Sequence, residues 1–252
     1  MNLQRLLSLT RKAVDDYQMI QAHDRIAVGI SGGKDSLTLL CALNGLKRFY
    51  PVPFEIVPLC VDLGFKDADP AAFDALSQFC SDLGCELQIV RSQIAEVVFD
   101  IRQESNPCSL CAKLRKGAFN TRAKELGCNK IAYAHHRNDF IETLLMSLIF
   151  EGRISCFSPV SYLDRMDLTL IRPLMYVEEP DIVGFARENG LPVMHNPCPA
   201  DGNTRREEMK QLLSELNKTY HGVSERMFGA ILRGNLKGWP SVKEPNSAQT
   251  DT

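Results

Sequence analysis

The 252-residue sequence has almost no net charge, no long hydrophobic run and no internal repeat. The formal net charge of −2 excludes a global basic field, so any nucleic acid must be held by a local basic patch. No apolar run reaches the length of a membrane span or of a signal-peptide core. We therefore expect a cytoplasmic protein with no membrane partner, large enough for one α/β domain with appended segments.

Two common nucleotide-binding motifs are also missing. A Walker A loop requires four residues between a glycine and Gly-Lys-Ser/Thr, and this chain has no such pattern. The glycines at 29, 32 and 33 do not fit the Rossmann fingerprint. What is present instead is Ser31-Gly32-Gly33-Lys34-Asp35-Ser36, between an apolar run over 25–30 and an apolar segment that begins at Leu37. This order predicts a strand, a glycine turn and a helix start, which together form a cradle for an anion.

The side chains of this loop specify the anion further. Ser31 and Ser36 add hydroxyl donors to the backbone N–H groups, and Lys34 adds a full positive charge. Asp35 would repel a phosphate unless a divalent cation lies between them. A Gly-Gly turn before a helix often binds nothing, but these four side chains together favour phosphate with Mg²⁺.

An alternation of apolar segments predicts a parallel sheet with helices on its faces. The predicted strands and helices are strands 25–30, 54–61, 86–91, 130–134 and 170–174, and helices 36–49, 70–83, 140–150 and 177–188. Ligands on such sheets bind at the carboxyl ends of the strands, where the loop 31–36 falls. A helix over 2–22 precedes the sheet, and residues 203–237 are helical in pattern. We divide the chain into an N-terminal helix (1–22), an α/β domain (23–200), a helical extension (201–239) and a disordered tail (240–252).

Polar residues follow two other predicted strands. Asp62, before Leu63-Gly64, fits a nucleotide contact and a turn-forming aspartate equally well. The run His135-His136-Arg137-Asn138-Asp139 follows the fourth strand, and Asp139 with Glu142 fits a capping box, although Asn138 could cap instead. Neighbouring side chains on a strand point to opposite sides, so one histidine should face the site.

The cysteines fall into two groups. Nine cysteines in a cytoplasmic chain do not indicate disulfides. Six stand singly, most among apolar neighbours: Cys41, Cys60, Cys80, Cys85, Cys128 and Cys156. Cys108 and Cys111 form a Cys-x-x-Cys pair, and Cys198 lies between two prolines. Three thiolates fit a [4Fe–4S] cluster with one open iron, zinc with His195 as a fourth ligand fits about equally well, and the pair alone could be a redox dithiol.

A local basic surplus follows the Cys-x-x-Cys pair. From Cys108 to Lys130 the single acid Glu125 is outnumbered by six basic residues: Lys113, Arg115, Lys116, Arg122, Lys124 and Lys130. Such a surplus can be a solvated helix face. Its position beside the cysteines favours a contact with a phosphate backbone.

These motifs together resemble the tRNA 2-thiocytidine synthetase (TtcA) family of PP-loop ATP pyrophosphatases. The matching segments span about residues 1–235: 31–36, 108–111, 135–144, 171–174 and Cys198. The chain departs from the family at Asn138-Asp139, where two carboxylates are common, and in Pro-Ala-Asp-Gly after Cys198. Thiolases with zinc fingers at both ends match less well, because no second Cys-x-x-Cys pair exists here.

The resemblance implies a parallel-sheet, adenine-nucleotide α-hydrolase-like (PP-loop) fold with helical N- and C-terminal additions. It implies ATP and Mg²⁺ on residues 31–36 with Asp62 and His136 as further nucleotide contacts, and catalytic roles for Lys34, Asp35 and Asp139. It implies a [4Fe–4S] cluster on Cys108, Cys111 and Cys198 that delivers sulfide to an adenylated tRNA cytidine, at position 32. The implied partners are tRNA and a sulfur donor, either sulfide or a cysteine desulfurase, and a homodimer is compatible with them.

Two other functions fit the same residues. One is a PP-loop ligase of the lysidine-synthetase type whose cysteines hold zinc. The other is a non-catalytic nucleotide-binding module, which would form no AMP with any tRNA. Bound iron against bound zinc separates the first from the thiolase, and AMP formation separates the second.

Overall fold

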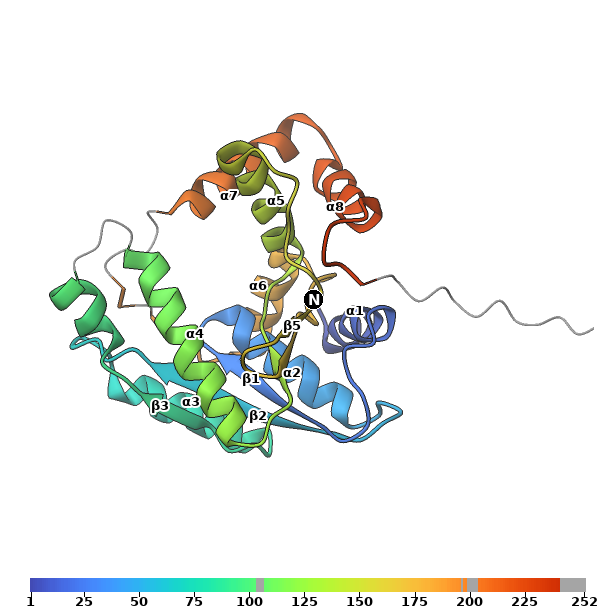
Figure 1. Cartoon of the computed structure of the whole chain (residues 1–252). Helices are drawn as coiled ribbons and strands as arrows, with labels where there is room; N and C mark the ends of the chain where they lie inside the picture. The colour runs from blue at the N-terminus through green and yellow to red at the C-terminus, as the bar shows by residue number, and fades with distance from the viewer. Residues whose placement is uncertain (103–106, 196, 199–203, 241–252) are drawn as a thin grey trace, which may run out of the picture.

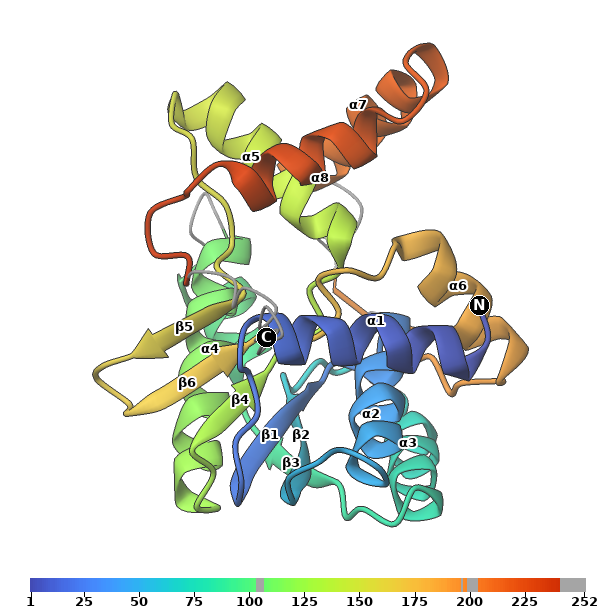
Figure 2. The same ribbon diagram turned by 90° about the vertical axis from the view of Figure 1, so that its right-hand side faces the viewer.

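A six-stranded sheet forms the centre of the molecule, with helices on both faces and a further helical group above one edge (Figures 1 and 2). The computed structural model describes residues 1–102, 107–195, 197–198 and 204–240. The strands are β1 (Asp24–Ile30), β2 (Phe54–Asp62), β3 (Gln88–Arg91), β4 (Lys130–Ala132), β5 (Val160–Leu163) and β6 (Leu168–Ile171). Their order is β3-β2-β1-β4-β6-β5, and every neighbouring pair is parallel except β5 with β6.

The described helices bury the two faces of this sheet in separate hydrophobic clusters. They are α1 (Leu3–Asp16), α2 (Lys34–Lys47), α3 (Pro70–Asp82), the π-helical η1 (Glu96–Arg102), α4 (Pro107–Glu125), α5 (Arg137–Glu151), α6 (Glu179–Glu188), α7 (Arg205–Thr219) and α8 (Val223–Arg233). Ile26 and Val28 of β1 pack with α1 and α2, whereas Ala27 packs with Phe119 of α4 on the other face. Successive strand residues point to opposite faces, so β1 supplies both cores.

The strand order places the candidate site. β1 lies between β2 and β4, so the chain moves from β1 toward one edge of the sheet and from β4 toward the other edge. In parallel sheets a crevice opens beyond the carboxyl ends of strands at such a point. The loop 31–36 follows β1 and the polar run 135–139 follows β4. Above this edge lie α5, α7 and α8 (Figures 1 and 2).

The α/β fold with a mainly parallel sheet confirms the predicted class, while some boundaries were wrong. β5 was not predicted; it pairs antiparallel with β6, Val160 opposite Ile171, and is short enough to give little apolar pattern. The first helix ends at Asp16 rather than 22, because Gln18 and His23 adopt positive φ angles of 49° and 67° that no α-helix continues through. α5 begins at Arg137 rather than Phe140.

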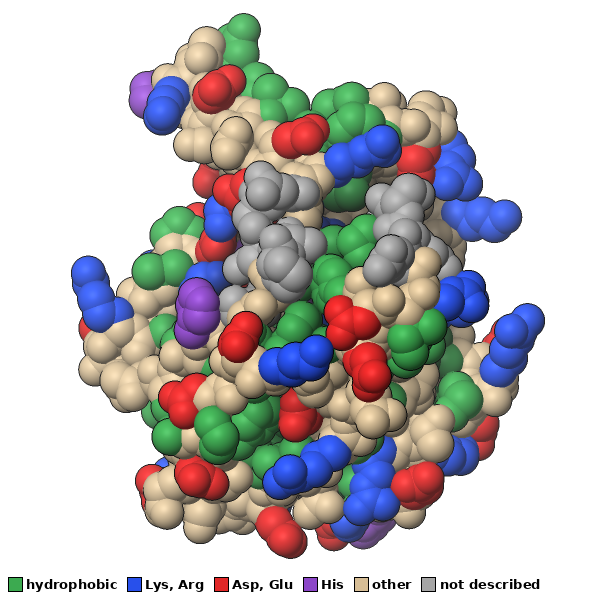
Figure 3. Space-filling view, turned by 90° about the vertical axis from the view of Figure 1, so that its left-hand side faces the viewer, with side chains coloured by type: hydrophobic (Ala, Val, Ile, Leu, Met, Phe, Trp, Pro, Cys, Tyr) green, Lys and Arg blue, Asp and Glu red, His purple; other side chains and the backbone are tan. Residues whose placement is uncertain are grey.

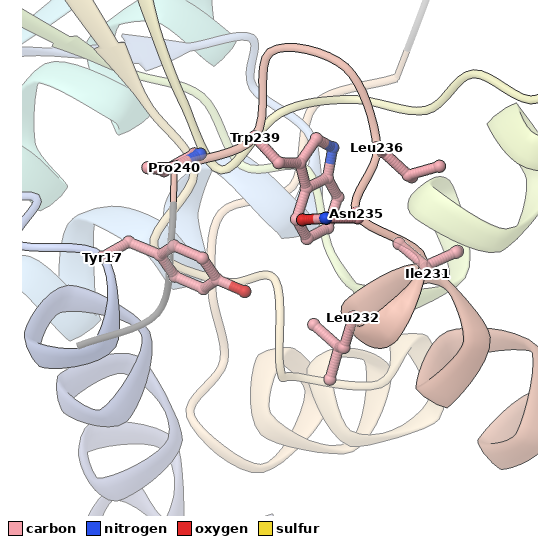
Figure 4. A pocket seen from close by; sticks show the side chains of 7 residues that line it. All are labelled: Tyr17, Ile231, Leu232, Asn235, Leu236, Trp239 and Pro240. Atoms are coloured by element: carbon pink, nitrogen blue, oxygen red, sulfur yellow. The ribbon is translucent and has the colours of Figure 1, made fainter. Parts of the chain in front are cut away.

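The helical additions share the central core. Leu6 and Val14 of α1 and Phe228 and Ile231 of α8 belong to the same buried cluster as α2. The four-part division of the chain stays a prediction, and all of the tail beyond Pro240 lies outside the described residues. A small cavity of about 80 Å³ between α1 and the segment after α8 contains none of the predicted site residues (Figure 4); it is lined by Tyr17, Ile231, Leu232, Asn235, Leu236, Trp239 and Pro240. Within the described ranges, no helix combines the length and apolarity needed to cross a bilayer.

Candidate functional site

The glycine-rich loop forms the predicted cradle at the start of α2. Gly33 is the N-cap and no side chain caps the helix, so the first backbone N–H groups of α2 are left for a ligand. The hydroxyl groups stabilise the loop itself: Ser36 Oγ donates to the Gly33 carbonyl at 2.8 Å, and the Ser31 N–H donates to Ser36 Oγ at 3.1 Å. The serines therefore shape the loop, and the N-terminus of α2 is oriented toward the carboxyl edge of the sheet.

Gly32 is required at its position for two reasons. Its φ is +79°, and a Cβ atom there would lie 2.6 Å from Met194 Sδ. The Met194 N–H also donates to the Gly32 carbonyl at 2.9 Å. Met194, on the segment that leads to Cys198, therefore packs against the loop and hydrogen-bonds to its backbone.

We expect Gly32→Ala to weaken nucleotide binding about tenfold or more and to destabilise the fold by about 1–3 kcal/mol, because the strained residue must displace Met194. Gly84→Ala is a matched control: Gly84 has φ +74° but no atom within 4 Å of an added Cβ. The control should lose stability through backbone strain alone and keep its nucleotide affinity. Chemical denaturation and titration with ATP check both effects, and equal affinity losses would contradict the role given to Gly32.

Lys34 lies among carboxylates. Its Nζ is 3.1 Å from Asp35 Oδ1 and 3.2 Å from Oε1 of Glu179, the first residue of α6. Burial lowers the pKa of Lys34, but the charges of Asp35 and then Glu179 outweigh burial and raise the pKa above its ordinary value. The lysine is therefore a fully charged cation at the mouth of the cradle, as phosphate binding requires.

His136 and Asp139 lie on the same side as the loop. His136 is buried, with Nε2 3.8 Å from Asp35 Oδ1 and Nδ1 3.5 Å from Asp139 Oδ2. In the described part of the chain, neither His136 Nδ1 nor Asp35 Oδ1 makes a hydrogen bond, although both atoms are buried and Asp35 Oδ1 has its ion pair with Lys34. Unsatisfied buried polar atoms are costly, so such a pair beside the cradle is suited to a ligand or a hydrated cation.

The two neighbouring histidines diverge as predicted. His135 stacks on Phe157 with ring centroids 4.3 Å apart and accepts a hydrogen bond from Arg172 Nε at 3.1 Å, whereas the ion pairs of His136 are with Asp35 and Asp139. Burial, followed by the charge of Arg172, lowers the pKa of His135 to about 3, so it is neutral.

The predicted cap was assigned to the wrong residues. His136 is the N-cap of α5, and the Asp139 carboxylate accepts its backbone N–H at 2.8 Å. Asn138 instead accepts the Glu179 N–H at 3.0 Å and so ties α5 to α6. Asp139 therefore has a structural duty besides any catalytic one.

Arg206 of α7 contributes a positive charge beside the carboxylates of α5. Arg206 Nη1 lies 2.9 Å from Asp139 Oδ1 and 3.6 Å from Glu142 Oε2. Glu142 is 3% exposed. Burial and then the charge of Asp139 raise the pKa of Glu142 to about 7, against the lowering effect of Arg206. The site thus holds a carboxyl group that titrates near neutrality.

This carboxyl group makes stability depend on pH. The folded-state pKa is above the ordinary 4.5, so its contribution is fully present below pH 4.5 and is lost as the pH rises through 7. We expect the parent chain to lose about 2 kcal/mol of unfolding free energy relative to Glu142→Gln between pH 5 and pH 8. Urea denaturation at both values measures this difference. Glu215→Gln, at an exposed position of α7, is the control, and the same pH dependence in Glu142→Gln as in the parent would refute the assignment.

Asp62 occupies the predicted strand end and forms a turn there. Its Oδ1 accepts the Gly64 N–H at 2.9 Å, and its carbonyl accepts hydrogen bonds from Ser92. The turn-forming role is thus present in the structure, and a nucleotide contact by Asp62 stays a prediction.

The three cysteines are brought to the same region. Cys108 and Cys111 lie in the first turns of α4. Burial raises the pKa of the Cys111 thiol, Arg115 lowers it, and Cys198 and Cys108 raise it. Cys111 therefore lies within electrostatic range of both other thiols, although no group of three His, Cys, Asp or Glu side chains in the described ranges has the arrangement of a formed metal site.

The predicted basic surplus is divided by the fold. Lys130 is buried and pairs with Asp24 at 2.7 Å, so it does not belong to any surface patch. Arg122 and Lys124 pair with Glu125 and Asp167. Lys113, Arg115 and Lys116 remain exposed beside the cysteines. On the face in Figure 3, Lys and Arg are interspersed with Asp and Glu, in keeping with a local rather than a broad basic surface.

Several residues of the site were not predicted as such. Glu179, Arg206 and Lys210, whose Nζ lies 2.7 Å from Glu179 Oε1, carry charges in otherwise ordinary helices. Glu142 was interpreted only as a cap. In the sequence, the one feature that distinguishes these residues is their charge, on helices that flank the motifs. Only the tertiary contacts reveal that these charges meet.

Comparisons with known proteins find relatives and a solved structure that cover most of the chain. A family model described as a PP-loop domain matches residues 4–216. A tRNA-cytidine(32) 2-sulfurtransferase of Geobacter sulfurreducens is 39% identical over 229 residues, covering 90% of this chain and 87% of that protein. One of Syntrophotalea carbinolica is 37% identical over 236 residues, covering 92% and 89%. The U34-tRNA thiolase NcsA from Methanococcus maripaludis, solved with its [4Fe–4S] cluster, has the same fold: TM-score 0.71, 23% identity, 90% of this chain and 78% of that one covered.

Proposed function

The chain belongs to the PP-loop family and, within it, to the tRNA-cytidine(32) 2-sulfurtransferases, and from that premise we propose that it is an ATP-dependent tRNA thiolase that replaces O2 of cytidine 32 with sulfur. The site divides the work into two parts. The loop 31–36 and its neighbours activate the base, and the three cysteines supply the sulfur. The proposal includes tRNA and a sulfur donor, either sulfide or a cysteine desulfurase, as partners in the cytoplasm.

The loop 31–36 and the start of α2 bind the phosphates of ATP. The free N–H groups of α2 and the charge of Lys34 would bind the β- and γ-phosphates, and Asp35 would hold Mg²⁺ beside them. The O2 atom of the cytidine attacks the α-phosphorus, and the bond to the pyrophosphate breaks. Lys34 stabilises the charge that develops on the departing pyrophosphate. The product is a base whose O2 leaves readily as part of AMP.

The three cysteines supply the kind of ligand atom, thiol sulfur, that iron–sulfur clusters require. Cys108, Cys111 and Cys198 are three thiols whose charges interact, and such a set can hold a cluster by three corners. Held by these three thiols, a [4Fe–4S] cluster would supply the sulfur, as sulfide, for C2 of the activated base. Burial raises the pKa of the Cys111 thiol overall, and the positive charge of Arg115 opposes that shift.

One observation connects the two parts of the site. Met194 packs against Gly32 of the loop 31–36 and hydrogen-bonds to it, and Cys198 follows Met194 by four residues in the sequence. A base activated over the loop therefore lies near the segment that bears the third cysteine. The target is in a single-stranded loop of tRNA, where unstacked bases are easily extruded.

Mass spectrometry of nucleosides tests the proposal. Anaerobically prepared protein with ATP, Mg²⁺, sulfide and tRNA should form 2-thiocytidine, and tRNA from a deletion strain should lack it. Loss of a different modified nucleoside, or of none, from the deletion strain would overturn the assignment of base and reaction.

A further inference from the structure

One carboxylate oxygen of Glu179 forms ion pairs with two lysines. Its Oε1 lies 3.2 Å from Lys34 Nζ, at the start of α2, and 2.7 Å from Lys210 Nζ, on α7. The Glu179 side chain is 15% exposed. Burial raises the pKa of Glu179, but Lys210 and then Lys34 outweigh it and lower the pKa below its ordinary value. The carboxylate is thus charged and is shared by two cations from distant parts of the sequence.

This sharing conflicts with the binding of ATP. Lys34 is compensated by Asp35 and by Glu179, so a phosphate oxygen that approaches Lys34 competes with a carboxylate already in place. Asp35 can remain beside the phosphates if Mg²⁺ lies between them. Glu179 cannot remain on Lys34 without repelling the phosphates, and a largely buried carboxylate left with no cation is costly.

We propose that Lys210 holds Glu179 away from Lys34 when ATP binds, so that Lys34 is released to the phosphates. Lys210 is a positioning residue in this account, because it acts through Glu179 and not on the nucleotide. The inference rests on the proposed binding of ATP by the loop 31–36. It assigns α7, which lies outside the loop motif, a part in nucleotide affinity that the motif alone does not reveal.

The lengths of the two lysine contacts to Glu179 indicate which lysine a phosphate would displace. Lys210 donates a 2.7 Å charge-assisted hydrogen bond to Glu179, while Lys34 contacts the same oxygen at 3.2 Å. Charge-assisted bonds of the shorter kind are the stronger ones. The weaker partner of Glu179 is therefore the one that a phosphate displaces, and the stronger partner keeps the carboxylate compensated.

A double-mutant cycle tests the inference on the full-length chain. Dissociation constants for the Mg²⁺ complex of AMPCPP, an ATP analogue with a methylene bridge, are measured by calorimetry for Lys210→Met, Glu179→Gln and the double variant. Lys210→Met should weaken binding about tenfold, because the unpaired Glu179 retains Lys34. Adding Glu179→Gln should restore binding to within about twofold of Glu179→Gln alone. Lys218→Met, at an exposed position in the last turn of α7, should change nothing.

The possible outcomes are distinct. Unchanged affinity in Lys210→Met, or the same loss with and without Glu179→Gln, would overturn the inference, since a direct phosphate contact or a purely structural role needs no glutamate. Turnover adds a second readout: Lys210→Met should raise KM for ATP more than it lowers kcat. If the parent chain binds the analogue but forms no 2-thiocytidine, the proposed function fails while the cycle still decides the role of Lys210. If it does not bind the analogue, both fail.

Discussion

Lys34→Ala is expected to reduce tRNA-dependent pyrophosphate release by at least about a hundredfold, even in protein that retains its full content of iron. The reason is the position of Lys34 at the mouth of the cradle, where it is the cation next to the open N-terminus of α2. Pyrophosphate carries more charge as it departs than ATP carries at the same atoms, so the lysine stabilises the transition state more than the bound substrate.

The measurement is pyrophosphate release with tRNA present, alongside iron content and the visible spectrum. Lys47→Ala is the matched control, since Lys47 is an exposed lysine in the last turn of the same helix. The control should match the parent chain. Pyrophosphate release by Lys34→Ala at more than a third of the parent rate would show that another group stabilises the phosphates.

Cys108→Ala is expected to abolish 2-thiocytidine formation while leaving the dissociation constant for the ATP analogue within about twofold, because the thiol contributes to sulfur supply and not to the loop 31–36. Cys108 lies in the first turn of α4, exposed and within electrostatic range of Cys111. Two remaining thiols hold an iron cluster poorly. Cys85→Ala, a change at a single half-buried cysteine, should retain thiolation and serves as control.

The metal content decides between the two uses of the cysteines. A brown anaerobic preparation whose iron is lost in Cys108→Ala supports a cluster. A colourless preparation with stoichiometric zinc, also lost in Cys108→Ala, would support the zinc-containing ligase and contradict sulfur supply by iron. Thiolation by Cys108→Ala at the parent rate would contradict both roles for the thiol.

The features that sequence predicted well are local. The strand from Asp24 to Ile30, the glycine turn and the start of α2 are contiguous, and each is specified by its own residues: an apolar run, Gly32 with its positive φ, and the apolar segment that begins at Leu37. Such features require no knowledge of what packs against them.

The features that sequence did not predict depend on distant partners. Lys130 was counted with a surface patch, but its pairing with Asp24 buries it at the start of β4. Glu142 fits a cap in the sequence, and only its burial beside Asp139 and Arg206 reveals a carboxyl group that titrates near pH 7. Charged residues are compatible with exposed helix faces until the fold brings α5, α6 and α7 together.

The account depends on ATP activation and sulfur supply acting on one base, and iron is the component that most directly tests it. Thiolation of tRNA by the purified protein should be measured by nucleoside mass spectrometry with ATP and sulfide, before and after anaerobic removal of iron and after its reconstitution. The account predicts 2-thiocytidine in the iron-containing and reconstituted samples and none in the iron-free sample. Full thiolation by iron-free protein prepared in air would contradict it.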